Sequence, residues 1–395
     1  MKLRHGRHLA YCTNIHRGET WEETFAALRQ HTLAVRDRVG GGRPFAIGLR
    51  LSARAARDLR EGEALSTFRR WLDHENSYVF TINGFPFGQF HGTRVKEQVY
   101  VPDWTHPERL EYTRLLFDIL AELVPPGVEG SVSTAPVSFK GFQPDERALH
   151  AARAHLWQAV DHIERVARTS RRDLHLDLEP EPLCTLETTS EAVAFFDRMR
   201  ADRPGDLRLQ EHLGINYDCC HLAIEFESAH DALERLRQHR IRIGKIHLSN
   251  ALSVRPTVEA RQALRAFADD TYLHQVVQRA PDGTLSRWLD LPHALAETPG
   301  TDPMAQLEWR IHFHVPLHHR PARLFETTAD HVLSTLDWLR AHPEEARHLE
   351  METYTWEVLP QDLKSRAVVD QLAQEYQWTL GALDARGLGV DRTSA

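Results

Sequence analysis

The segment Leu174-His175-Leu176-Asp177-Leu178-Glu179-Pro180-Glu181 predicts a short β-strand that ends in two carboxylates and a proline. On both sides of it, short apolar runs recur along the chain and alternate with longer amphipathic segments. This alternation is typical of repeated βα units, in which each strand is followed by a helix that covers one face of the sheet. We therefore expect an α/β protein.

Eight segments have the length and apolar character of strands. They are His8–Ile15, Phe45–Leu51, Tyr78–Ile82, Gly130–Ala135, Leu174–Leu178, Leu213–Tyr217, Arg242–Leu248 and His348–Glu352. The segments between them predict helices at Thr20–Val39, Ala53–Asn76, Pro107–Leu123, Pro144–Thr169, Ser190–Arg200, Ser228–His239 and Thr328–Ala341. Thr20 with Glu23 three residues later is a capping box, which marks the start of the first helix.

Eight strands joined by helices favour a closed (β/α)8 TIM barrel over an open doubly wound sheet. No glycine-rich phosphate-binding motif follows any of the strands, and Gly40-Gly41-Gly42 is better interpreted as a helix terminator. The chain has 395 residues, and barrels of this kind often exceed 250 residues as one unit. We predict a single barrel domain over residues 1–388, with a frayed tail at 389–395.

About a hundred residues separate the seventh and eighth predicted strands, and we expect an insertion there at about 252–325. Thr271–Ala280 and Thr284–Leu291 flank Pro281-Asp282-Gly283, which predicts a β-hairpin. Residues 308–316 form a further strand-like run. An insertion after a barrel strand emerges over the active mouth, so we interpret this one as a lid or substrate-specificity element.

Composition limits the classes of function. The formal net charge is -8, which disfavours a nucleic-acid partner because such partners select a basic surface. The sequence shows neither a signal-peptide-like segment nor a run of about 18 apolar residues, so we expect a cytoplasmic protein without a membrane segment. Four cysteines are too few for a disulfide framework.

The chemistry of a TIM barrel lies where its strands end, and four successive predicted strands end in metal-ligating residues. They are Glu179, Asp218, His247 and Glu352. Any one of them alone is readily explained as a helix cap or an arginine partner. Four together are not, because clustered carboxylates need a cation. Mixed oxygen and nitrogen ligands suit Mn²⁺, Mg²⁺, Fe²⁺, Co²⁺ or Zn²⁺.

Further histidines fall near this mouth. His221 follows Asp218 by three residues and is a candidate metal ligand or substrate contact, or else a helix-cap residue. His312 and His314 alternate along one strand and so share a face, which Arg310 shares as well. We interpret the two histidines as additional metal ligands and Arg310 as a contact for an anionic substrate, although a solvated hairpin face would show the same pattern.

Loops at the ends of the first and third strands supply the remaining candidates. His91 lies in a loop at 84–92 that is rich in glycine, proline and aromatic residues, which indicates a shaped loop. Asn14, His16 and Asn83 lie at strand ends. We predict that these four residues contact the substrate.

The strand-end pattern resembles that of the xylose-isomerase-like TIM-barrel superfamily. There, Glu on strand five, Asp-x-x-His on strand six, His on strand seven and Glu on strand eight match Glu179, Asp218/His221, His247 and Glu352. The superfamily includes sugar epimerases and isomerases, dehydratases and endonuclease-IV-type nucleases. Tyr11–His16, Phe85–Gly92 and Ile311–Pro316 look more particularly like the EboE metabolite traffic family of bacterial ebo gene clusters.

The resemblance implies a divalent-metal-dependent isomerase or epimerase that acts on a sugar, cyclitol or related polyol through an enediolate. Glu179 and Glu352 would be the paired catalytic acid and base as well as metal ligands, Asp218 and His247 would complete the metal shell, and His221 would orient the substrate. The EboE likeness implies a role in secondary metabolism, with a polyol or metabolite precursor as partner. A homo-oligomer and other pathway proteins are left open.

Two other classes of function remain. A metal-dependent phosphodiesterase or nuclease is favoured by the extra histidines His312 and His314, which are similar to a ligand pair of the nuclease branch that binds a metal cluster. A non-catalytic metabolite-binding component would keep the metal pocket without turnover. The long insertion departs from the family's short connection, so substrate specificity cannot be transferred from the resemblance.

Overall fold

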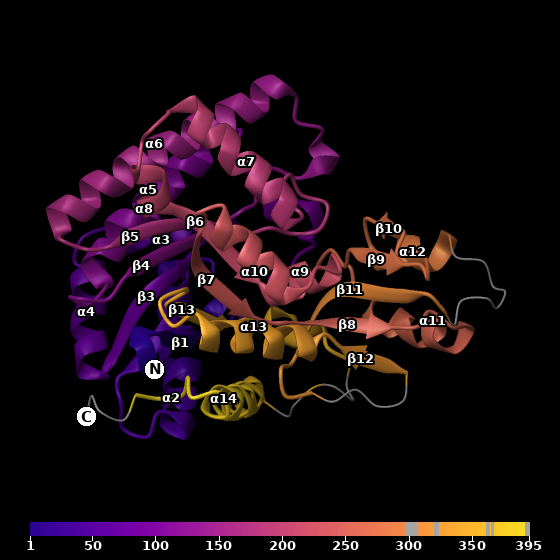
Figure 1. Ribbon diagram of the computed structural model, residues 1–395. Coiled ribbons are helices and arrows are strands. Elements are labelled where there is room, and N and C mark those ends of the chain that lie inside the picture. Colours follow the sequence, from indigo (N-terminus) through magenta and orange to yellow (C-terminus); the bar gives the residue numbers. More distant parts are fainter. Residues whose placement is uncertain (298–305, 320–323, 361–363, 365–366, 392–395) are drawn as a thin grey trace.

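Eight parallel strands form the main sheet of the computed structural model, which describes residues 1–297, 306–319, 324–360, 364 and 367–391 (Figure 1). Their order around the sheet is β1-β13-β7-β6-β5-β4-β3-β2. A parallel bridge between Cys12 and Gly48 joins the two edge strands, so the sheet is a nearly closed barrel. The strands are β1 (His8–Tyr11), β2 (Phe45–Arg50), β3 (Ser77–Asn83), β4 (Gly130–Thr134), β5 (Leu174–Leu178), β6 (Leu213–Asp218), β7 (Arg242–Leu248) and β13 (His348–Met351). This confirms the predicted TIM barrel.

Helices flank the barrel (Figure 1). They are α1 (Trp21–Ala27), α2 (Leu33–Val39), α3 (Ala53–Arg60), α4 (Ala64–His74), α5 (Pro107–Leu123), α6 (Glu146–Ser170), α7 (Thr189–Asp202), α8 (Arg208–His212), α9 (Cys219–Ile224), α10 (Ala229–Gln238), α13 (Ala329–Ala341) and α14 (Val368–Asp384). The predicted capping box of Thr20 and Glu23 is present at the start of α1. The single helix predicted at 53–76 is wrong, because the chain breaks it at Gly62, whose φ of 52° is left-handed.

The interior of the barrel is polar. Lys245 and Glu350 form an ion pair in which both side chains are fully buried. Two glycines make room for charged side chains: a Cβ at Gly48 would lie 1.7 Å from Glu350 Oε1, and one at Gly244 would lie 2.0 Å from Asp177 Oδ1. Buried charges of this kind must be paired or hydrogen-bonded, so the interior is an ordered network.

The insertion forms a second, antiparallel sheet with the order β10-β9-β11-β8-β12, which lies to the right of the barrel in Figure 1. The whole insertion contains the strands of this sheet and two helices, which follow one another as β8 (Asn250–Val254), α11 (Val258–Leu264), β9 (Val276–Arg279), β10 (Leu285–Trp288), α12 (Leu291–Glu297), β11 (Glu308–Val315) and β12 (Phe325–Thr327). β9 pairs with β10 across Pro281-Asp282-Gly283, as predicted for the hairpin. Only Ser249 separates the end of β7 from the start of β8, so the second sheet begins slightly before the predicted insertion.

The two ends of the chain meet. Leu3 forms an antiparallel bridge with Val390, and Arg4 N donates to Gly389 O at 3.0 Å. These two residues of the predicted frayed tail are therefore paired, while 392–395 lie outside the described residues. Among the described residues, none of the helices has the length and apolar character needed to cross a membrane.

Candidate metal centre

The four predicted ligands converge at the carboxyl ends of four neighbouring strands, and none is more than 4% exposed. Nδ1 of His247 lies 3.3 Å from Glu179 Oε1, 3.3 Å from Asp218 Oδ2 and 3.1 Å from Glu352 Oε2. One ligand atom from each residue lies within 4.8 Å of all the others. Strand order explains this: β5, β6, β7 and β13 are consecutive around the barrel, and each supplies one residue within one position of its carboxyl end.

His247 is oriented by the carboxylate of Glu350, which lies outside the candidate ligand set. Its Nε2 lies 2.9 Å from Glu350 Oε2, and Glu350 is in turn paired with Lys245. When Nε2 donates to Glu350, Nδ1 presents a lone pair to three carboxylates, which is the arrangement of a metal-binding histidine. Burial alone would lower the pKa of His247, but the charges of Glu352 and Glu179 raise it well above its ordinary value. If Nδ1 is protonated, it offers only one hydrogen, and one hydrogen cannot satisfy three carboxylates.

The donor set fits a divalent cation. Ser249 Oγ and the backbone N–H of His221 donate to Asp218 Oδ1 at 2.8 and 3.0 Å, whereas Oδ2 is buried and has no hydrogen-bond partner among the described residues. A buried carboxylate oxygen without a partner is costly. Ligands at about 2.0–2.2 Å from a cation are separated by roughly 3.0–3.5 Å from one another. The separations around His247 fall in this range.

Three asparagines hold the outer oxygens of the two glutamates. Asn14 Nδ2 and Asn83 Nδ2 donate to Glu352 Oε1 at 2.8 and 3.2 Å, and Asn216 Nδ2 donates to Glu179 Oε2 at 2.8 Å. Each glutamate therefore has one oxygen fixed by an amide and the other directed toward His247. Asn14 and Asn83 thus contact a candidate metal ligand and also line the cavity described below. Sequence reasoning missed Asn216, which lies two residues before Asp218 on the same face of β6.

A second set of imidazoles lies beside the first. His221 Nε2 and His314 Nε2 lie 3.1 and 3.3 Å from His312 Nε2. The opposite nitrogens all face acceptors: Nδ1 of His221 lies 2.9 Å from Pro180 O, that of His312 lies 2.7 Å from Gln275 Oε1, and that of His314 lies 2.9 Å from Glu352 O. The three Nε2 atoms can therefore all present lone pairs toward one another, as in a three-histidine cation site.

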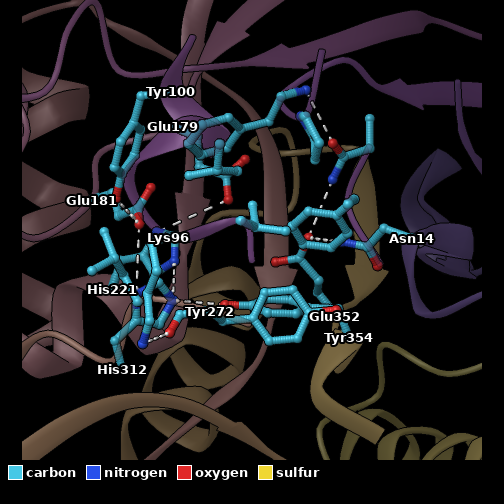
Figure 2. A pocket seen from close by; sticks show the side chains of 17 residues that line it. Asn14, Lys96, Tyr100, Glu179, Glu181, His221, Tyr272, His312, Glu352 and Tyr354 are labelled. Carbon is cyan, nitrogen blue, oxygen red and sulfur yellow. Dashed lines mark hydrogen bonds and ion pairs between the residues drawn. The ribbon is translucent and has the colours of Figure 1, made fainter. Parts of the chain in front are cut away.

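A small cavity of about 50 Å³ lies beside these groups (Figure 2). Glu179, Glu352, His221 and His312 line it together with aromatic side chains, Tyr354 among them. Its polar wall also contains Glu181, which accepts a hydrogen bond from Tyr100 Oη at 2.6 Å. Burial raises the pKa of Glu181 to about 7.

Lys96 is the sole ammonium or guanidinium group among the described residues that line this cavity, and it is fully engaged. Its Nζ donates to Asp290 Oδ2 and to the backbone oxygens of Tyr272 and Asp269 at 2.7–2.8 Å. These bonds connect the loop after β3 to the insertion. The cavity therefore presents carboxylates, imidazoles and rings, but no unpaired fixed positive charge from the described part of the chain.

The other predicted substrate contacts do not line the cavity. His91 lies directly behind it, where its Nε2 is 2.5 Å from Asn14 O and its Nδ1 is 2.7 Å from Tyr272 Oη. His16 bonds to Tyr11 Oη at 2.9 Å and stacks on His31.

Arg310 also lies outside this cavity. It bonds to Glu308 and to Ala223 O and covers the ring of Phe226. β11 has a register shift between Ile311 and Val315, in the segment that carries His312 and His314 but not Arg310. Arg310 therefore has structural partners of its own, and His312 and His314 reach the mouth without it.

No protein-family model and no curated protein sequence match the chain. Among solved structures, it is similar to a D-tagatose 3-epimerase-like protein (TM-score 0.51, 11% identity, covering 96% of this chain and 97% of the other). It is also similar to an L-ribulose 3-epimerase (TM-score 0.51, 12% identity, covering 98% and 96%). Solved xylose-isomerase-like TIM-barrel proteins are among the further neighbours. Likeness at this identity shows the fold alone: the chain has a TIM-barrel fold similar to that of the first two proteins.

Proposed function

We propose that the chain is a divalent-metal-dependent isomerase or epimerase that acts on a sugar, cyclitol or related polyol by proton transfer through an enediolate. The main support for this proposal is that Glu179 and Glu352 both belong to the candidate ligand set and both line the cavity. Two carboxylates at one carbon centre can remove a proton and return one, which an epimerase requires. The L-ribulose 3-epimerase and the D-tagatose 3-epimerase-like protein of similar fold support this class of reaction.

The residues of the chain have separable roles in this reaction. Glu179, Asp218, His247 and Glu352 would hold the cation, which supplies charge stabilisation for the substrate oxygens and acidifies the neighbouring C–H. Glu179 and Glu352 would exchange the proton, with Asn14, Asn83 and Asn216 fixing their orientation. Because the amides each occupy one carboxylate oxygen, the second oxygen remains directed into the site.

The cavity favours an uncharged polyol. Rings such as Phe85, Phe90 and Tyr354 offer apolar faces to C–H groups and limit the entry of water. A phosphorylated substrate would need a free cationic partner, and the one ammonium group in the described wall is already bonded to Asp290. Following the likeness to the EboE family, we place the reaction in a secondary-metabolite pathway.

The three-histidine set favours a second candidate. Together with the first ligand set, His221, His312 and His314 could hold a second cation, and paired metals are typical of phosphodiesterases. An endonuclease-IV-type activity would use both cations. The net charge of -8 disfavours a nucleic-acid substrate, and so does the lack of a free cation among the described residues of the cavity wall. A metabolite-binding component that retains the pocket without turnover is the third candidate.

Exchange of a substrate C–H hydrogen with the solvent tests the proposal. The Mn²⁺- or Co²⁺-loaded protein is incubated in D₂O with a panel of ketopentoses, ketohexoses and inosose-type ketones, and each is analysed by ¹H NMR and mass spectrometry. We expect deuterium at one carbon next to the carbonyl of one substrate, and loss of this exchange in Glu352→Gln. Glu61→Gln, at an exposed loop position, is the matched control and should exchange normally.

The alternatives give different results in the same preparation. Cleavage of DNA at abasic sites without exchange would replace the proposal by the nuclease. Saturable binding of a polyol that is unchanged after long incubation, and is retained in Glu352→Gln, would replace it by the binding component.

A further inference from the structure

Two histidines at the amino-terminal end of the barrel each bury an imidazole nitrogen without a hydrogen-bond partner among the described residues. They are His175 on β5 and His348 on β13, and the unpartnered atom is Nε2 in both. Both side chains are fully buried, and the ring centroids are 5.3 Å apart. Each lies four residues before Glu179 or Glu352 on the same strand, which is about 13 Å along a strand from the candidate metal centre.

The opposite nitrogens of both rings are bonded. His175 Nδ1 lies 3.0 and 2.9 Å from the two oxygens of Asp177, so a hydrogen on Nδ1 is shared by this carboxylate. His348 Nδ1 lies 2.7 Å from Ser131 Oγ, whose hydroxyl donates to Thr81 Oγ1 at 2.7 Å. Ser131 Oγ is therefore an acceptor for His348 Nδ1. Burial raises the pKa of Asp177 to about 8. When this carboxyl is ionised, both rings carry their hydrogen on Nδ1, and both Nε2 atoms are bare lone pairs.

Glu129 completes the cluster just before β4. One of its carboxylate oxygens and one nitrogen of each histidine lie within 4.8 Å of one another. Its side chain is 17% exposed, so the cluster has a route to solvent on this side. Arg242 and Arg347 each bond one oxygen of Glu129 at 3.0 Å, but a carboxylate oxygen that accepts one hydrogen bond retains a lone pair for a second partner.

The ligand chemistry selects the type of cation. Two neutral imidazoles and one carboxylate form the His₂Glu set that binds Zn²⁺ with a water in the fourth position. The charges of Arg242 and Arg347 weaken the attraction for any cation. An ion held mainly by electrostatic attraction to oxygen, such as Mg²⁺ or Ca²⁺, would therefore be excluded, whereas an ion with strong bonds to imidazole would not. The hydrogen bond from His175 to Asp177 repeats the orientation of His247 by Glu350.

We propose that His175, His348 and Glu129 form a second binding site for Zn²⁺ or a similar transition-metal ion, with water as a further ligand, at the end of the barrel opposite the candidate active mouth. The ion connects β5 and β13 to the residue that precedes β4. Residues at this end of a TIM barrel contribute to stability rather than to the reaction. The site is independent of the proposed function, since none of its ligands lies in the mouth.

X-ray diffraction from crystals of the unaltered, Zn²⁺-loaded chain provides a test that needs no variant. Data collected on both sides of the zinc absorption edge should give an anomalous peak within bonding distance of both Nε2 atoms. A water that donates to the two lone pairs is the other possible occupant and gives no such peak. Peaks at the mouth with none between His175 and His348 would overturn the proposal.

Counting Co²⁺ per chain after dialysis gives the second readout. His348→Gln should carry one equivalent fewer than the native chain, and Glu129→Gln should bind that equivalent at least tenfold more weakly. His212→Gln is the control, because this buried histidine bonds to Leu174 O and lies outside the cluster. His247→Ala should lose metal at the mouth while keeping this ion. Equal metal content in the native chain and both cluster variants would contradict the site.

Discussion

Replacing Glu350 by glutamine should lower both the metal affinity of the mouth and the stability of the barrel. Glu350 accepts from His247 Nε2 at 2.9 Å and is the partner of the fully buried Lys245. Loss of a carboxylate behind a metal-binding histidine weakens metal binding by roughly 10–100-fold, or about 1.4–2.8 kcal/mol. The same change leaves the ammonium of Lys245 buried without its partner, which costs about 3–5 kcal/mol of unfolding free energy.

The double variant Glu350→Gln/Lys245→Met distinguishes the two effects. It removes both charges, so the unfolding free energy should recover by most of the loss, whereas the metal affinity should stay low because His247 still lacks its carboxylate. Urea unfolding in EDTA measures the stability, and competition with a chromophoric chelator measures the affinity. An unchanged affinity in Glu350→Gln, or an affinity restored by Lys245→Met, would refute the role assigned to this carboxylate.

Three further predictions concern stability. Free metal at 100 times its dissociation constant should raise the unfolding free energy by about 2.7 kcal/mol over the value in EDTA, and urea unfolding that shows no difference would contradict binding to the folded state. Burial raises the pKa of Glu375 from 4.5 to about 7, so the folded state binds this proton more tightly than the unfolded chain. Relative to Glu375→Gln, the native unfolding free energy should therefore fall by about 3 kcal/mol as the pH rises from 4.5 to 7; parallel pH profiles would contradict this. Lys96→Met should destabilise the chain by about 3–5 kcal/mol because Asp290 loses its buried partner, and Lys96→Met/Asp290→Asn should recover part of this in thermal unfolding.

The sequence predicts the barrel and the convergence of its four candidate ligands because both depend on local patterns. Strand-sized apolar runs separated by amphipathic segments fix the order of elements, and the residue type at the end of each strand is visible directly. Glu179, Asp218, His247 and Glu352 then meet because the carboxyl ends of parallel strands share one rim. The side chains that hold the candidate ligands in place were missed, although Asn216 and Glu350 lie two residues before Asp218 and Glu352. Because alternate residues of a strand share one face, the two-residue spacing from Asp218 and from Glu352 indicates both positions.

Other features depend on contacts that are distant in sequence. His312 and His314 reach the mouth because β11 pairs with β8 and β9 in a separate antiparallel sheet, and a periodic pattern does not specify such pairing. The partners of Arg310 and the paired end of the chain at Val390 are tertiary contacts of the same kind. The break at Gly62 is a local feature, and its glycine was visible in the sequence.

Metal content tests the central claim most directly. The purified chain is loaded with Mn²⁺, Co²⁺ or Zn²⁺, dialysed and examined by elemental analysis, beside Glu179→Ala and His247→Ala. We predict at least one tightly bound divalent ion in the native chain and one fewer in each variant. A native chain that retains none of the three ions, or variants that retain as much as the native chain, would contradict a cation shared by the carboxylates of four neighbouring strands.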